Sequence, residues 1–335
     1  MFLSVTGKKI KMKILGGKNM KKRFMAMTMA ALMAATTLTG CGSGSAEESL
    51  DKLTFTYVTA PLNVPSIIEK EKGIFAKTFE DMGIAVEYAE LTSGADQTQA
   101  LASGDVQVLY AVGATSVILS AANDADIKVL NMYSRSPKAF CMYAKDETLT
   151  SPEALRGKTI AGPAGTNLHE LLVAYLATAD MTLDDVNYVN MSIPEAKAAL
   201  DGGSIDVALV AGATAYTAKQ QGYHLVADGE GLIDAIIAVA VTDEFYNAHP
   251  EIIEKLEEAQ DEIADFMEEQ EEEALQISAD ALELDKAAVE EMAAYYDFST
   301  ELTDADKAGF QRTADFMFEN GMIENKLDVN TLFYE

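Results

Sequence analysis

The stretch Lys158–Leu172, KTIAGPAGTNLHELL, predicts a strand, a tight turn and the beginning of a helix. Lys158–Ala161 has the composition of a short buried strand, and the Gly and Pro residues at 162–165 are turn formers. Thr166 and Asn167 stand where a helix would be N-capped. Because the first N–H groups of a helix have no partner within it, several backbone donors point to one place after such a turn. The stretch therefore predicts an α/β unit with a binding place for a small polar or anionic group.

A related feature occurs twice in the chain, at a constant offset of 99 residues. Ala100–Thr115 reads ALASGDVQVLYAVGAT and Ala199–Thr214 reads ALDGGSIDVALVAGAT, and seven of the sixteen positions match. Each copy joins a helix end to a hydrophobic strand that finishes in a Gly-Ala-Thr turn. The repeat predicts two α/β lobes of similar build, with the two turns facing each other across a cleft. The alternative is that helix–Gly–strand units share this composition without sharing a role.

The first forty residues have the composition of a secretion signal. They carry eight Lys or Arg and no acid, and the apolar run Phe24–Leu38 is too short for a comfortable membrane span. We expect a signal peptide over residues 1–40, with translation starting at Met20, rather than a retained membrane helix. Leu-Thr-Gly-Cys, ending at Cys41, resembles the lipobox of bacterial lipoproteins. This resemblance implies lipid on Cys41 and a flexible tether over residues 41–49.

The charge of the remaining chain excludes several partners. Residues 41–335 hold 17 Lys and Arg against 54 Asp and Glu, a net charge of −37. Such a chain is repelled by nucleic acid and by anionic lipid surfaces. Once Cys41 is modified, Cys141 has no disulfide partner, and no Cys/His cluster has the spacing of a metal site. We therefore expect no metal, no cofactor and no nucleic-acid partner.

Strand and helix patterns alternate over Leu53–Tyr133 and restart at Lys158, as in parallel sheets covered by helices. Two isolated strands, at 139–144 and 236–241, interrupt this alternation. We interpret them as crossings between two doubly wound α/β lobes. The predicted lobe one comprises residues 50–138 and 237–335, including a helical C-terminal part, and the predicted lobe two comprises residues 139–236. The acidic run at 251–273 is predicted to be an amphipathic helix with a solvated face.

Several segments resemble the solute-binding proteins of ABC transporters, which have the type II periplasmic binding protein fold. The segments are Val64–Phe75, Thr92–Gly94, Gln99–Asp105, Leu155–Gly162, Gly165–Thr166, Ala199–Val207 and Gly222–Tyr223. The similar branch is the one grouped with sulfonate, taurine, nitrate and thiamine-pyrimidine binding. The resemblance implies two lobes, two hinge strands and a ligand clamped between them. It also implies a permease and its ATPase as partners, a position on the outer face of the cytoplasmic membrane, and a monomer.

The chain departs from the family pattern at two places. Ala114–Ser116 stands where many members carry Asp or Pro, and Ala211–Ala213 stands where a Trp-Asp-Pro sequence is frequent. The resemblance therefore does not by itself assign the family's usual ligands to this chain.

The carboxyl ends of the predicted strands give the candidate site, because ligands of open α/β sheets bind beyond these ends. The loops there are rich in Gly, Ala, Ser, Thr and Asn, so backbone N–H groups and hydroxyls would make most contacts. For each loop the alternative is an ordinary turn or helix cap. The predicted ligand-binding residues are Leu62, Asn63, Ser93, Gly94, Gly113, Ala114, Thr115, Arg135, Ser136, Gly165, Thr166, Asn167, Ser192, Gly212 and Thr214.

The charge of these loops limits the charge that a bound ligand can carry. No Lys or Arg lies in the lobe-two loops, which disfavours a dianion such as phosphate or sulfate. A sulfonate, a taurine-like zwitterion or a nitrate-like monoanion fits better. A neutral heterocycle, such as a thiamine pyrimidine precursor or a purine, remains an alternative. Because the chain has no Trp, stacking would come from Tyr or Phe, for instance Tyr216.

Two other classes of function, an enzyme and a lipid-tethered sensor or adhesion protein, have less support from the sequence. An enzyme of the thiamine-pyrimidine synthesis type would need a reactive His or Cys near the site. The candidates are Cys141, His224, His249 and His169, and we expect His169 to be structural. A lipid-tethered sensor or adhesion protein is the other class.

The lipobox yields a first prediction. Replacing Cys41 by Ala should release the protein from the membrane, because two acyl chains on one residue give stable anchoring. Fractionation of cells expressing the variant would measure the release. A variant that stays membrane-bound through an uncleaved leader would contradict the prediction.

Overall fold

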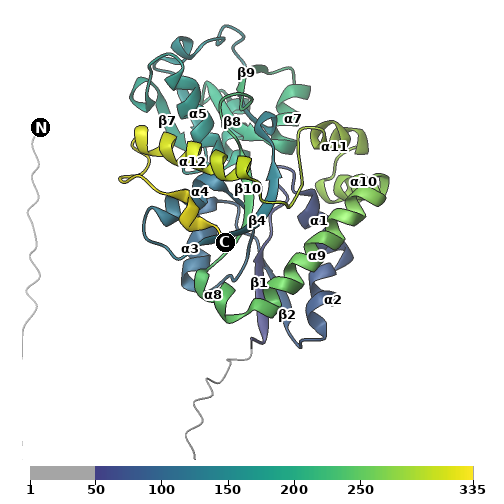
Figure 1. Ribbon diagram of the computed structural model, residues 1–335. Coiled ribbons are helices and arrows are strands. Elements are labelled where there is room, and N and C mark those ends of the chain that lie inside the picture. Colours follow the sequence, from purple (N-terminus) through teal and green to yellow (C-terminus); the bar gives the residue numbers. More distant parts are fainter. Residues whose placement is uncertain (1–49, 335) are drawn as a thin grey trace, which may run out of the picture. The chain divides into compact units, whose positions relative to one another are not determined.

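Figure 1 shows the computed structural model, which describes residues 50–334. The predicted signal peptide, the lipidation at Cys41 and the tether lie outside the described residues. None of the helices in residues 50–334 is long and apolar enough to cross a membrane. The described part has the predicted α/β class, with two groups of strands covered by helices.

The strands of lobe one form two neighbouring sheets. β1 (Lys52–Thr56) pairs in parallel with β2 (Ala85–Ala89), and Phe55 of β1 bridges to Val108 just before β3. β3 (Leu109–Gly113) and β4 (Lys128–Arg135) flank the antiparallel strand β10 (Ile236–Val241). β10, which follows lobe two in the sequence, is thus the middle strand of a lobe-one sheet.

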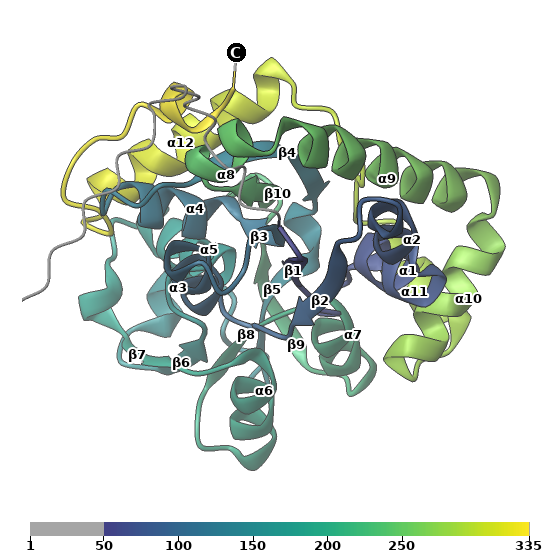
Figure 2. The same cartoon turned by 90° about the horizontal axis from the view of Figure 1, so that it is seen from below.

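Helices cover both faces of these strands (Figure 2). Tyr110 of β3 packs with Phe55 and Phe75, whereas Leu109 and Val112 join a second core. The alternation of β3 is interrupted at Ala111, which has φ of 82° and lies opposite a register shift in β10. The first face carries α1 (Val64–Lys72), α2 (Ile74–Glu80) and α9 (Pro250–Glu269). The second face carries α3 (Gly94–Ser103), α4 (Ala114–Ala121) and α12 (Asp304–Glu319).

Lobe two is built on one five-stranded sheet. The strand order is β7 (Asn187–Asn190), β6 (Thr159–Gly162), β8 (Val207–Ala211), β5 (Phe140–Ala144) and β9 (His224–Asp228). β6 runs parallel to β7 and β8, whereas β5 is antiparallel to both of its neighbours. The helices that follow its strands are α5 (Asn167–Ala177), α6 (Ile193–Gly202) and α7 (Gly212–Gln220).

The two isolated strands of the sequence are the inner antiparallel strands β5 and β10. The chain leaves β4 for β5 through residues 136–139 and leaves β9 for β10 through residues 229–235. These crossings are adjacent, since the Ser136 N–H donates to the Ala235 carbonyl at 3.4 Å. The predicted fold class is confirmed. The lobe boundaries and a hinge at the crossings remain predictions.

The C-terminal region is helical, as predicted. Ile252, Leu256 and Ile263 of α9 are buried, and its acids lie mainly on the opposite face. The predicted continuous helix is broken at Gln270, which lies between the end of α9 and the start of α10 (Glu271–Leu282). The remaining elements are α8 (Asp243–Ala248), α10 (Glu271–Leu282), α11 (Lys286–Ala293) and the short 3-10 turns η1 (Pro137–Ala139), η2 (Pro152–Leu155), η3 (Leu183–Asp185) and η4 (Val329–Leu332).

Lobe one buries a carboxyl group, Glu69, at the end of α1. Glu69 Oε1 accepts hydrogen bonds from the Tyr88 hydroxyl at 2.7 Å and the Phe75 N–H at 3.2 Å. The side chain is 1% exposed, and burial raises the pKa of its carboxyl to about 7. The ionised form is therefore destabilised in the folded protein at neutral pH.

This burial predicts a pH-dependent stability. A carboxyl whose pKa is higher in the folded than in the unfolded state stabilises the fold at low pH, and the contribution falls as pH rises from about 4.5 to about 7. Glu69→Gln should therefore raise the free energy of unfolding at pH 8 by on the order of 2 kcal/mol. Urea unfolding at pH 5 and pH 8 would measure the effect. An equal gain at both pH values would contradict the explanation.

Candidate functional site

The loops that follow the strands of the two lobes meet in direct contact. The Ala213 N–H, at the start of α7, donates to the Pro61 carbonyl of the β1–α1 loop at 3.2 Å. Gly212 has φ of 53°, and a Cβ placed there would lie 1.6 Å from the Pro61 oxygen. This approach of two backbones requires glycine at position 212.

A second contact joins α4 of lobe one to the turn after β6. The Ser116 hydroxyl donates to the Gly165 carbonyl at 3.0 Å. Gly94, at the start of α3, packs so closely on Ser116 that a Cβ there would lie 1.9 Å from the hydroxyl oxygen. Gly94, Ser116 and Gly165 are therefore in one contact region, as the strand-end rule predicts.

The third contact is a buried polar group that we call the Glu170 cluster, made of Thr115, Asn167, Glu170 and Thr313. Thr115 Oγ1 lies 2.7 Å from Asn167 Oδ1 and 2.7 Å from Glu170 Oε2. The Thr313 hydroxyl of α12 donates to Glu170 Oε1 at 2.9 Å. All four residues are buried, and burial raises the pKa of the Glu170 carboxyl to about 7. Sequence reasoning found Thr115 and Asn167 but missed Glu170, which looks like an ordinary helical acid.

These contacts differ from the expected pairing of the two Gly-Ala-Thr turns. The turn at Gly113 packs against Asn167, where a Cβ on Gly113 would lie 3.2 Å from the amide oxygen. The turn at Gly212 packs against Pro61 instead. Each turn therefore contacts a different loop of the other lobe. That the two turns face each other and share one ligand remains a prediction.

Several predicted site residues stabilise their own loops. Asn63 is buried and donates to the carbonyls of Val58 and Ala60, which fixes the β1–α1 loop beside the buried Leu62. Ser93 accepts from the Asp96 N–H, and Ser192 forms a capping box with Glu195. The remaining members of the set lie nearby: Thr166 donates to the Pro163 carbonyl, Ala114 and Ser136 are buried, and Thr214 is half-buried at the start of α7.

Arg135 directs its guanidinium into lobe one. It donates to both carboxylate oxygens of Asp306, at 2.6 and 2.7 Å, and to the Ser299 and Glu301 carbonyls, both at 2.7 Å. These bonds stabilise the segment that leads into α12. The expected interaction of Arg135 with an anionic ligand would have to compete with a buried carboxylate and two carbonyls.

A tyrosine-rich cavity of about 390 Å³ adjoins Gly212. It lies among β5, α7, β9 and the end of α11, and its aromatic lining consists of Tyr143, Tyr216, Tyr223, Tyr295 and Tyr296. The Tyr296 hydroxyl is buried and has no hydrogen-bond partner among the described residues. Sequence reasoning identified only Tyr216, because the other rings come from segments far apart in the chain.

Four charged groups that line the tyrosine-rich cavity form two ion pairs. Lys138 binds Glu230 at 2.9 Å between the two crossings, and Lys219 of α7 binds Glu291 of α11 at 2.5 Å. Both pairs are substantially exposed, so each contributes little to stability. Their positions nevertheless present a positive and a negative group together at the cavity wall.

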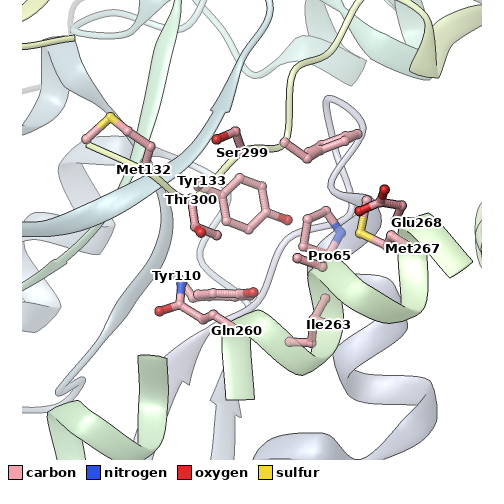
Figure 3. A pocket seen from close by; sticks show the side chains of 12 residues that line it. Pro65, Tyr110, Met132, Tyr133, Gln260, Ile263, Met267, Glu268, Ser299 and Thr300 are labelled. Carbon is pink, nitrogen blue, oxygen red and sulfur yellow. The ribbon is translucent and has the colours of Figure 1, made fainter. Parts of the chain in front are cut away.

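A separate cavity of about 280 Å³ lies within lobe one (Figure 3). Tyr110 and Tyr133 line one side, and Ile263 and Met267 of α9 line another. Phe298, also in its lining, stacks on Tyr296 with ring centroids 5.3 Å apart. The stacked pair thus contributes one ring to each cavity.

The candidate nucleophiles are not activated. His169 accepts the Gly165 N–H through Nδ1 and stacks on Tyr188, and burial lowers its imidazole pKa. Burial raises the pKa of the Cys141 thiol to about 12, which keeps it protonated. Within residues 50–334, no cluster of three or more His, Cys, Asp or Glu could hold a metal ion.

Comparison with known proteins identifies a matching family and relatives of this chain. A family model described as "NMT1/THI5 like" matches residues 62–274. The chain is 25% identical over 315 residues to the "Putative aliphatic sulfonates-binding protein" of Bacillus subtilis, covering 92% of this chain and 93% of that protein. It is 30% identical over 193 residues to the taurine-binding periplasmic protein of Escherichia coli, covering 56% and 58% of the two chains.

A solved structure shows the same fold. The alkanesulfonate-binding protein SsuA from Xanthomonas axonopodis pv. citri, bound to MOPS, superposes with a TM-score of 0.77 at 20% identity, covering 85% of this chain and 98% of that one. The chain therefore belongs to the NMT1/THI5-like family, and its relatives are solute-binding proteins. The predicted family resemblance is confirmed.

The contact at Gly212 yields a prediction. Gly212→Ala should prevent the Pro61 loop from meeting α7, because its Cβ would overlap the Pro61 carbonyl. Small-angle scattering should then show a larger radius of gyration than for the wild type. Gly222→Ala is the matched control, since Gly222 also has positive φ but a Cβ added there would have no atom within 4 Å. Both variants should lose roughly 1–2 kcal/mol of stability to backbone strain. Equal radii for the two variants would contradict a steric role of Gly212.

Proposed function

We propose that the chain is an extracytoplasmic solute-binding lipoprotein of an ABC importer. It captures a small organic solute between its lobes and delivers it to a membrane permease coupled to an ATPase. The observation that carries this proposal is the meeting of strand-end loops from both lobes in buried polar contacts. A solute between them would replace these contacts with its own, as expected for a clamp.

The remaining parts of the proposal concern location and motion. Lipid on Cys41 would hold a monomer at the outer face of the cytoplasmic membrane, and residues 41–49 would be the tether. Residues 50–138 with 237–335 would move against residues 139–236 about the two crossings. Two adjacent crossings permit such a hinge closure.

The preferred ligand class is a taurine-like aminosulfonate. The relatives are named for aliphatic sulfonates and taurine, and the cations near the candidate site already have carboxylate partners: Lys138 with Glu230, Lys219 with Glu291, and Arg135 with Asp306. A dianion would meet a carboxylate beside each of these cations. A zwitterion can bind both members of an ion pair, with its sulfonate at the Lys and its ammonium at the Glu.

Two other ligand types are alternatives to the aminosulfonate. A simple sulfonate or a nitrate-like monoanion would use the backbone N–H groups at the helix N-termini. A neutral heterocycle, such as a thiamine pyrimidine precursor or a purine, would use the tyrosine rings, for instance Tyr216 and Tyr295. Catalysis is disfavoured because the Cys141 thiol is protonated and the His169 ring is held by the loop at Gly165.

A ligand series tests the proposed class. Taurine should raise the melting temperature of the mature protein more than ethanesulfonate, which lacks the amine, or ethylamine, which lacks the sulfonate. At a concentration one hundred times its dissociation constant, a ligand adds about 2.7 kcal/mol of stability. Isothermal titration would then give the affinity. A larger effect of ethanesulfonate, or of a pyrimidine, would overturn the zwitterion in favour of the corresponding alternative.

A further inference from the structure

The hydrogen count in the Glu170 cluster does not balance if the carboxyl is ionised. Thr115 Oγ1 lies 2.7 Å from two oxygens, Asn167 Oδ1 and Glu170 Oε2. A hydroxyl has one hydrogen and can donate to only one of them. In the orientation that directs the Asn167 amide nitrogen to the Ile236 carbonyl, 3.5 Å away, the amide oxygen faces Thr115, and the hydrogen count below refers to this orientation. An ionised Glu170 would leave two acceptor oxygens in contact without a hydrogen between them.

A proton on Glu170 Oε2 satisfies every contact. The carboxyl then donates to Thr115, Thr115 donates to Asn167, and the other carboxyl oxygen still accepts from Thr313. No cation or backbone N–H contacts either carboxyl oxygen within residues 50–334. The side chain is 4% exposed, and the contacts of its two oxygens are the hydroxyls of Thr115 and Thr313.

The Glu170 cluster spans the two lobes. Glu170 and Asn167 are on α5, which packs on β5 and β8 of lobe two. Thr115 is on α4 and Thr313 is on α12, and both helices pack on lobe one. Separation of the lobes would break the bonds from both threonines and admit water to the carboxyl. The protonation of Glu170 is therefore linked to closure.

We propose that the Glu170 cluster is a proton-dependent contact between the lobes, such that closure takes up one proton on Glu170 and acidification favours the closed form. This regulation rests on the proposed clamp motion but not on the identity of the solute. A rise in pH would favour opening of the solute-free protein.

The charged groups around Glu170 agree with this direction. It lines a cavity of about 770 Å³ with Asp234 on the crossing, with Arg312 and Asp306 on α12, and with Arg135 and Asp297 beside them. Arg312 binds Asp234 at 2.8 Å and Arg135 binds Asp306 at 2.6 Å, so neither guanidinium contacts Glu170. Burial is the main cause of its raised pKa, and the charge of Asp234 raises it further, against the lowering effect of the two threonine hydroxyls.

The sign and the pH range follow from the raised pKa. In the closed form the pKa of Glu170 is about 7, whereas an exposed carboxyl titrates near 4.5. Between these values the closed form binds more protons than the open form. The ratio of closed to open protein should fall by up to about tenfold per pH unit across this range and level off above it.

The test measures the distance between the lobes in the solute-free mature protein. Spin labels on Gln99→Cys of lobe one and Ser204→Cys of lobe two, both at exposed positions, would report this distance from pH 4.5 to 8.5. The wild type should open as pH rises. Glu170→Gln should remain closed throughout, because the Gln amide donates to Thr115 as the protonated carboxyl does.

The matched control is Glu69→Gln, which removes the other buried carboxyl with a raised pKa but lies within lobe one. It should leave the pH dependence of the interlobe distance unchanged. Thr313→Val is a second variant, and it should shift the opening to lower pH by removing a bond to the carboxyl. A pH-independent distance in the wild type, or the same pH dependence in wild type and Glu170→Gln, would overturn the proposal. Because no solute is present, failure of the ligand series would not affect this result.

Discussion

The desolvation of polar loops at the junction between the lobes constrains the rest of the structure. The strand-end loops carry backbone N–H groups and carbonyls that cannot be left without partners once water is excluded. The structure satisfies them across the junction, with Ala213 donating to Pro61 and Ser116 donating to Gly165. These short contacts require small residues, which explains Gly212 where the lobes approach and Gly94 where α3 packs on Ser116 within lobe one. The polar composition of the loops is thus a consequence of their shared burial.

Most of the fold could be predicted because buried strands and capped helices have local signatures. The strand-end rule also located the junction, since it depends on the order of elements and not on side-chain detail. The strand β9, HLVAD, was missed because it is a partly exposed edge strand without a continuous apolar run. The end of α1 at Gly73 could be predicted, because glycine is a common helix C-cap, whereas the immediate start of α2 after the same residue was not predicted.

The parts of the site that the sequence did not predict depend on contacts between distant residues. Arg135 looked available to an anion, but Asp306, 171 residues later, binds it in a bidentate pair. The tyrosine cavity gathers rings from β5, α7, β9 and the residues after α11, and no local pattern marks them as one group. Glu170 appeared to be one acid among many, and its burial became evident only when α12 was placed against α5.

The closed junction also limits what kind of solute can bind with useful affinity. The loops already satisfy one another, so a solute gains only the difference between its own contacts and those it replaces. A purely apolar molecule would leave the Ser116 hydroxyl and the Pro61 carbonyl without partners, which costs more than its burial returns. A molecule with both donors and acceptors can replace both kinds of contact. The same accounting explains the role of a proton on Glu170, since it supplies a donor between the Glu170 carboxyl and the Thr115 hydroxyl.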